Sequence, residues 1–231
     1  MQTSHSNQQL QQTNSISVMD MLVLVLAVAI AVYLRLNLLN IPFDRDEGEY
    51  AYAGQQILQG NLPYDVIYNM KFPGVYYMYA SVFAVFGESV AAIRLTGLFM
   101  HLATTFFLFG CVSFLFSKRT VIYAAATFLI ISLSFPAESI LSYAVVFVVF
   151  FGCAGLWMMT QFLSKQKLIW LFFSGVCLCL SCLMKQPGAI YGVITLVVFF
   201  VYKPKTVSYF KLLIWIIGGL LPAALLLGYL Q

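Results

Sequence analysis

The most informative shortage in this sequence is charge. Only 9% of its 231 residues are Asp, Glu, Lys or Arg, whereas 62% are hydrophobic. A soluble domain usually carries about 25% charged residues. A chain of this length cannot bury so much apolar surface in its own core, so lipid must solvate most of it. The net charge of +4 is small and does not indicate a nucleic-acid partner.

Signals for a metal site and for a cleaved leader are also lacking. Cys179 and Cys182 lie in an apolar run without His or acidic neighbours, which favours small buried hydrophobes over a zinc site. Residues 1–17 contain no Lys or Arg, so they lack the basic region of a signal peptide. We expect 1–17 to be a disordered cytoplasmic tail that precedes a retained first helix.

Long apolar runs are abundant. A transmembrane helix needs about 20 residues, and the run 75–87 is too short to cross and rich in Tyr, which predicts an interfacial or re-entrant helix. The sequence therefore predicts an all-α polytopic membrane protein with about seven transmembrane helices in one domain, 18–231. The expected spans are 18–39, 90–116, 120–136, 139–163, 168–184, 188–202 and 206–230.

The distribution of charge supports this topology. If the N-terminus is cytoplasmic and 75–87 does not cross, seven of the twelve basic residues lie inside, as the positive-inside rule requires. The first loop, 40–89, is then external and large enough to have its own structure. We expect a multi-pass protein of the cytoplasmic membrane whose chemistry faces outside, because this loop holds six of the eight acidic residues, namely Asp44, Asp46, Glu47, Glu49, Asp65 and Glu88.

Four of these acids lie in the segment FDRDEGEYAYAGQQILQG, residues 43–60. Asp44 is suited to be a helix N-cap, with Glu47 at the third helical position completing a capping box. The helix is expected to run over 45–59 and to end at Gly60. Helical spacing puts Asp46 and Glu49 on one face. Capping explains only one or two of the four carboxylates, so a functional role is an open alternative for the others.

A longer pattern follows this acidic segment. The loop 40–89 and the start of the next span together resemble the first external loop of membrane glycosyltransferases of the GT-C fold. The most similar groups are the dolichyl-phosphate-mannose protein mannosyltransferase-like family and the aminoarabinose lipid A transferase family. The resemblance covers about 40–100, and more weakly 185–188. Its residues are Asp46-Glu47-Gly48-Glu49-Tyr50, Gly60, Lys71-Phe72-Pro73 (where the family often has Lys-Pro-Pro), Phe86-Gly87 and Arg94-Leu95.

The resemblance implies a polytopic GT-C-like fold and a transferase activity. Such enzymes move a sugar from a polyprenyl-phosphate carrier to an acceptor hydroxyl outside the cytoplasm; the acceptor could be a protein, a lipid or a glycan. The base is expected at Asp46, with Glu47 beside it or orienting the acceptor. Cations meet the leaving phosphate, and the candidates for this are Lys71, Lys185 and Arg94, with Glu138 as a candidate second acid.

Several alternatives stay open at this level. Lys71 and Lys185 could simply reach lipid headgroups, and Arg94 could pair with Glu88. No cofactor is expected, although Asp44 and Asp46 resemble a metal-binding pair and a divalent metal is a minor alternative. A transporter is a competing function, but transporters place ionisable groups within their spans. A non-catalytic scaffold is another. Members of the similar families are longer, so the chain could be an inactive fragment, a short form or half of an enzyme.

Overall fold

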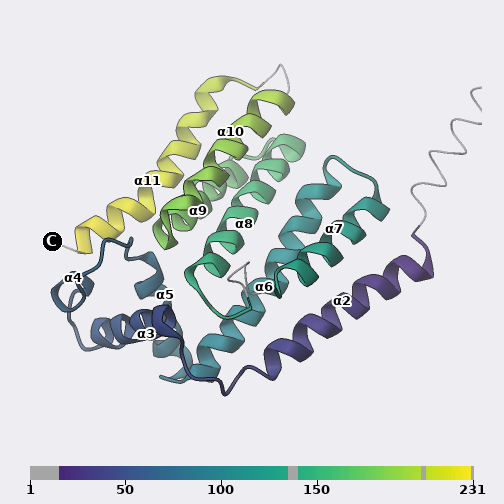
Figure 1. Cartoon of the computed structure of the whole chain (residues 1–231). Helices are drawn as coiled ribbons and strands as arrows, with labels where there is room; N and C mark the ends of the chain where they lie inside the picture. Colours follow the sequence, from purple (N-terminus) through teal and green to yellow (C-terminus); the bar gives the residue numbers. More distant parts are fainter. Residues whose placement is uncertain (1–15, 135–139, 204–206, 230–231) are drawn as a thin grey trace, which may run out of the picture.

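The computed structural model describes residues 16–134, 140–203 and 207–229. Within these ranges the secondary structure consists of helices and turns, without a strand. The longer helices of the described residues lie side by side and alternate in direction along the chain (Figure 1). They are α2 (Val18–Leu36), α6 (Val90–Ser113), α7 (Lys118–Ile131), α8 (Ala144–Lys165), α9 (Leu168–Met184), α10 (Ala189–Tyr202) and α11 (Leu212–Tyr229). The one-turn helices η2 (Gln186–Gly188) and η3 (Tyr209–Lys211) precede α10 and α11.

Among the described residues, four helical segments are long and apolar enough to cross a membrane by themselves: Val18–Leu36, Val90–Ser113, Ala144–Lys165 and Tyr209–Gly228. The architecture is thus that of an all-α polytopic membrane protein, as predicted. The other three helices of the bundle are shorter. Helix α7, for example, has 14 residues, a length of about 21 Å at 1.5 Å per residue. The number of seven crossings therefore stays a prediction.

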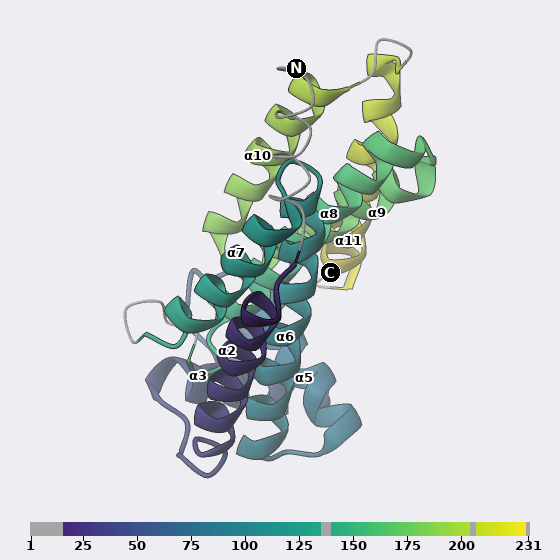
Figure 2. The same ribbon diagram turned by 90° about the vertical axis from the view of Figure 1, so that its right-hand side faces the viewer.

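Three short helices gather at one end of the bundle (Figures 1 and 2). They are α3 (Arg45–Leu58), α4 (Pro63–Val66) and α5 (Gly74–Phe86). Helix α5 corresponds to the short helix predicted at 75–87. It ends at Gly87, whose φ of 82° is a backbone conformation that glycine tolerates best. Ser89 then caps α6 by accepting a hydrogen bond from the Ala92 N–H at 3.1 Å, so the chain turns directly from α5 into the bundle.

Most basic residues lie at the opposite end of the bundle from α3 and α5. They lie at the start of α7, at the turn between α8 and α9, and between α10 and α11, and these parts of the chain are remote from α3 and α5 (Figures 1 and 2). Of the seven residues expected inside, those that the structure describes are Lys118, Arg119, Lys165, Lys167, Lys203 and Lys211, whereas Lys205 lies outside the described residues, as do residues 1–15 of the predicted tail. The two ends thus differ in charge as the topology requires. Which end is cytoplasmic stays a prediction.

An aromatic core joins the short helices to the bundle. Tyr76 and Tyr79 of α5 and Phe147 of α8 are all 0% exposed. The Tyr79 hydroxyl donates a hydrogen bond to the Ser142 carbonyl at 2.9 Å. Helices α3 and α5 approach closely at Gly54, where an added Cβ would lie 2.9 Å from a backbone nitrogen of α5. This packing fixes α3, and the carboxylates at its start, against the end of the bundle.

Candidate active site

The start of α3 is built as the sequence predicted. Asp44 is the N-cap, and Glu47 completes the capping box by accepting a hydrogen bond from the Asp44 N–H at 3.3 Å. The helix ends at Leu58, and Gly60 follows with a φ of 89°. Because the helix turns by about 100° per residue, Asp46 and Glu47 point in different directions.

Glu47 points into the protein and is 0% exposed. Its carboxylate forms an ion pair with the guanidinium of Arg94, which is 4% exposed. It also accepts a hydrogen bond from the Ser142 N–H at 2.8 Å. A buried carboxylate needs such donors, because an unpaired charge in the interior is very unfavourable. Glu47 therefore ties α3 to α6 and to the segment that precedes α8.

Asp44 lies at the surface beside the buried ion pair of Glu47 and Arg94. Its carboxylate accepts hydrogen bonds from the Tyr143 hydroxyl and from the Arg45 N–H, the latter at 2.6 Å. The bond from Tyr143, followed by that from the Arg45 N–H, lowers the pKa of Asp44. The same bond raises the pKa of Tyr143, which keeps the phenol protonated and donating. The hydrogen bond itself joins the start of α3 to the residue that precedes α8.

Asp46 faces away from the buried ion pair of Glu47 and Arg94 and toward Lys71. The Asp46 side chain is 45% exposed, and its carboxylate lies 3.6 Å from the Lys71 ammonium group. Lys71 is closer to a second carboxylate, that of Glu49, at 3.2 Å. It also lies over the ring of Tyr50, 4.8 Å from the ring centre. The predicted base and the predicted phosphate ligand are thus brought together, 25 residues apart in the chain, at the exposed side of α3.

The backbone around Lys71 is held as well. The Lys71 N–H donates to the Asn69 side-chain oxygen at 3.1 Å, and the Lys71 carbonyl accepts from the Tyr64 hydroxyl at 2.8 Å. The Asn69 amide in turn donates to Glu49 at 2.8 Å. Burial moves the pKa of the Tyr64 phenol, already well above neutral, further up.

The segment that contains Lys185 approaches the same loop. The Gln186 side-chain amide donates to the Met70 carbonyl at 3.4 Å. An added Cβ on Gly74, at the start of α5, would lie 2.5 Å from the Leu183 carbonyl oxygen. This contact joins the neighbours of the two expected phosphate ligands, because Met70 precedes Lys71 and Gln186 follows Lys185. Lys185 itself lies at the junction of α9 and η2 and is partly exposed.

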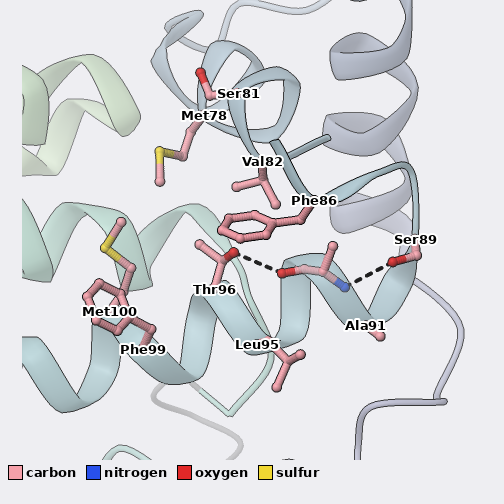
Figure 3. Close-up of a pocket in the computed structure, with 11 residues that line it drawn as sticks. Met78, Ser81, Val82, Phe86, Ser89, Ala91, Leu95, Thr96, Phe99 and Met100 are labelled. Atoms are coloured by element: carbon pink, nitrogen blue, oxygen red, sulfur yellow. Dashed lines mark hydrogen bonds between the residues drawn. The ribbon is translucent and has the colours of Figure 1, made fainter. Parts of the chain in front are cut away.

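Two apolar grooves flank α5. The first, of about 710 Å³, lies between α5 and α6 (Figure 3), where Met78, Val82 and Phe86 approach Thr96 and Met100. The second, of about 630 Å³, lies between α5 and helices α9 and α11 and reaches Gly74 at the start of α5. The lining of both grooves is predominantly apolar, so each suits a hydrocarbon chain better than a polar ligand.

Not every expected residue faces this exposed side of α3. Arg94 and Glu47 are buried and bonded to one another, so neither carries an exposed charge. The pairing of Arg94 with Glu88 is corrected: Glu88 accepts a hydrogen bond from Gln55 at 2.9 Å, because Arg94 is turned inward to Glu47. Glu138 lies outside the described residues.

Three residues that contact Lys71 or Asp44 had no site role predicted from the sequence, namely Glu49, Asn69 and Tyr143. Glu49 was placed on the face of Asp46 by helical spacing, which was the available signal for it. Tyr143 and Asn69 had no signal, because their contacts depend on how distant segments pack. Among the described residues, no three His, Cys, Asp or Glu side chains lie close enough together to hold a metal ion.

Comparison with known proteins gives the class of the molecule. Residues 70–229 match the family described as dolichyl-phosphate-mannose-protein mannosyltransferase. The match spans more than half of the chain and includes Lys71, Arg94 and Lys185, whereas the acidic helix α3 precedes it. No match was found among curated proteins or among solved structures.

The fold, the clustered ionisable groups and this match define a membrane glycosyltransferase of the GT-C type. The chain belongs to the dolichyl-phosphate-mannose-protein mannosyltransferase family. This agrees with the resemblance seen in the sequence. The family uses a sugar donor linked to a polyprenyl phosphate.

Proposed function

We propose that this chain transfers a hexose or pentose from a polyprenyl-phosphate carrier to an acceptor hydroxyl on the extracytoplasmic side of the cytoplasmic membrane. In this mechanism Asp46 is the general base, and Lys71 and Lys185 meet the phosphate of the donor. The observation that carries the proposal is the pair formed by a half-exposed Asp46 and Lys71, 3.6 Å apart at the end of an apolar helix bundle.

The proposed reaction needs a base and a cation in close proximity. The acceptor oxygen attacks the anomeric carbon while the bond from that carbon to the phosphate oxygen breaks. The proton of the acceptor hydroxyl moves to Asp46, and the phosphate leaves with the bonding electron pair. Lys71 balances the charge on that phosphate. The ammonium group therefore has to exchange some of its contact with Asp46 for contact with the donor.

The apolar grooves beside α5 support a lipid-linked donor. Helix α5 begins at Gly74, three residues after Lys71, and the groove between α5, α9 and α11 reaches this residue. A phosphate bound at Lys71 would therefore have an apolar surface nearby for the first units of its prenyl chain. We propose that the prenyl chain of the donor occupies this groove. Lys71 would then meet the phosphate as a point charge.

In this proposal Glu47 and Arg94 support the site without touching the donor. Their buried ion pair fixes the first turn of α3 and with it the direction of Asp46. The extracytoplasmic location rests on charge, because the basic residues gather at the other end of the bundle.

The test is turnover of a polyprenyl-phosphate mannose donor by protein reconstituted in vesicles. Asp46→Asn should lower the rate by about 10²–10⁴-fold, because the amide cannot accept the proton. Asp65→Asn is the matched control, since Asp65 is an exposed acid of the same loop, and it should keep the wild-type rate.

Equal rates for wild type and Asp46→Asn would remove Asp46 as the base. A folded wild-type protein that consumes no donor would instead favour the non-catalytic scaffold or inactive fragment. Uptake of a solute by the same vesicles without sugar transfer would favour the transporter. The side of the membrane from which a single cysteine at position 62 reacts with an impermeant thiol reagent tests the orientation of the loop separately.

A further inference from the structure

The Glu49 carboxylate is held by more hydrogen bonds than a solvated carboxylate on a helix surface needs. Glu49 lies one turn after Asp46 on α3, and its side chain is 26% exposed. Its carboxylate accepts hydrogen bonds from the Lys71 ammonium at 3.2 Å, the Asn69 amide at 2.8 Å and the Tyr76 hydroxyl at 2.8 Å. A solvated helix carboxylate requires none of these bonds.

The three donors come from two parts of the molecule. Tyr76 belongs to α5 and is 0% exposed, so it is a rigid support for the carboxylate. Burial, and then the bond to Glu49, raises the pKa of Tyr76, so the phenol remains a donor. Asn69 and Lys71 belong to the loop before α5, and Asn69 also accepts the Lys71 N–H at 3.1 Å. Glu49 thus holds Lys71 through both its ammonium group and its backbone.

This arrangement matters because lysine is a flexible ligand. Its ammonium group sits on four methylene groups whose rotamers must be ordered when a phosphate binds. A carboxylate that orders the side chain beforehand reduces that cost. Asp46 could not do this as well, because its contact with Lys71 is longer, 3.6 Å against 3.2 Å, and it is the more exposed of the two.

We propose that Glu49 is a positioning residue, which holds the Lys71 ammonium beside Asp46 so that the donor phosphate meets an ordered cation. The inference rests on the proposed role of Lys71 in binding the donor phosphate. It assigns Glu49 a task that differs from that of Asp46: Glu49 keeps its contact with Lys71 while Asp46 gives its contact up to the donor.

Two effects of Glu49 on a bound phosphate have opposite signs. Its negative charge repels the phosphate, so removing the charge should tighten binding if repulsion dominates. Its hold on Lys71 orders the cation, so removing the charge should weaken binding if positioning dominates. The sign of the change in affinity therefore decides between the two, and a general loss of folding would instead lower the fraction of protein that binds.

The experiment measures the affinity of the purified full chain in detergent for farnesyl phosphate, a short prenyl monophosphate, by calorimetry. Glu49→Gln retains an oxygen that can accept from Tyr76 and Asn69 but loses the ion pair with Lys71. We expect its Kd to rise by about five- to tenfold, the range for one immobilised flexible side chain. Tyr76→Phe leaves the charge in place and removes one support, and should raise the Kd by about two- to threefold.

Two controls isolate the phosphate and the charge. Farnesol lacks the phosphate, so its affinity should be the same for wild type, Glu49→Gln and Tyr76→Phe. Glu88→Gln removes a carboxylate of the same loop whose side-chain bond is to Gln55. It changes the net charge equally and should leave the Kd for farnesyl phosphate unchanged.

Unchanged or tighter binding by Glu49→Gln would overturn the inference. If Lys71→Met binds farnesyl phosphate much more weakly than wild type while Glu49→Gln does not, the inference alone fails and the proposed function stands. If Lys71→Met and wild type bind equally, the proposed role of Lys71 fails, and that of Glu49 with it.

Discussion

Glu47 and Asp46 are adjacent in the chain, carry the same charge and both have a basic partner, yet their environments are opposite. Glu47 and Arg94 are buried, at 0% and 4% exposed. Asp46 and Lys71 are open to solvent, with side chains 45% and 30% exposed. Burial makes the first pair indispensable to the structure, because neither charge has water as a substitute. Exposure leaves the second pair free to exchange partners, which a catalytic pair requires.

The largest loss of stability is expected when one partner of the buried pair is removed. Arg94→Met leaves the Glu47 carboxylate buried without its cation, and should cost about 3–5 kcal/mol of stability. Thermal unfolding of the purified protein in detergent measures this. Arg45→Met is the control, because Arg45 is an exposed cation at the start of α3, the helix that carries Glu47. It should change stability by less than about 0.5 kcal/mol. Similar losses for both variants would contradict the distinction between the pairs.

Removing Lys71, the cation of the second pair, should have a small effect on stability and a large effect on activity. Lys71→Met should change stability by no more than about 1 kcal/mol, as for other exposed ion pairs. On the proposed function it should lower kcat/KM for the lipid-linked donor by about 10²-fold, since the leaving phosphate loses a charge partner. Unfolding and donor turnover are measured on the same preparation. A large loss of stability with normal turnover would make Lys71 structural.

The smallest expected change in stability concerns Asp44, the N-cap of α3. Asp44 has a lowered pKa because Tyr143 and the Arg45 N–H donate to it. Its contribution to stability is therefore complete above the unfolded-state pKa of about 3.9 and is lost as the pH falls through the lower folded-state value. Tyr143→Phe should reduce this loss, which unfolding temperatures measured from pH 7 to pH 3 will report. An identical acid profile in the variant would show that the bond from Tyr143 contributes nothing.

Much of this molecule follows from local patterns in the sequence. The apolar runs, the short helix after Lys71, the capping box of Asp44 and Glu47 and the turn at Gly60 were all predictable, because each depends on neighbouring residues or on transfer of apolar surface into lipid. The inward pairing of Arg94 with Glu47 was not. It depends on where the packing of α3 against α5 places Glu47 relative to α6, and no spacing rule connects residues 47 positions apart.

The sequence by itself determined that this is a helical membrane protein whose scarce acids concentrate in one loop, because hydrophobicity and helix signals act over short stretches of chain. Only the tertiary structure decided which of those acids is available for chemistry. Packing turned Glu47 into the interior against Arg94, left Asp46 at the surface beside Lys71, and gave Glu49 three donors from α5 and the loop before it. Adjacent carboxylates thus differ in role, since the free energy of a charge depends on the solvent and partners that surround it.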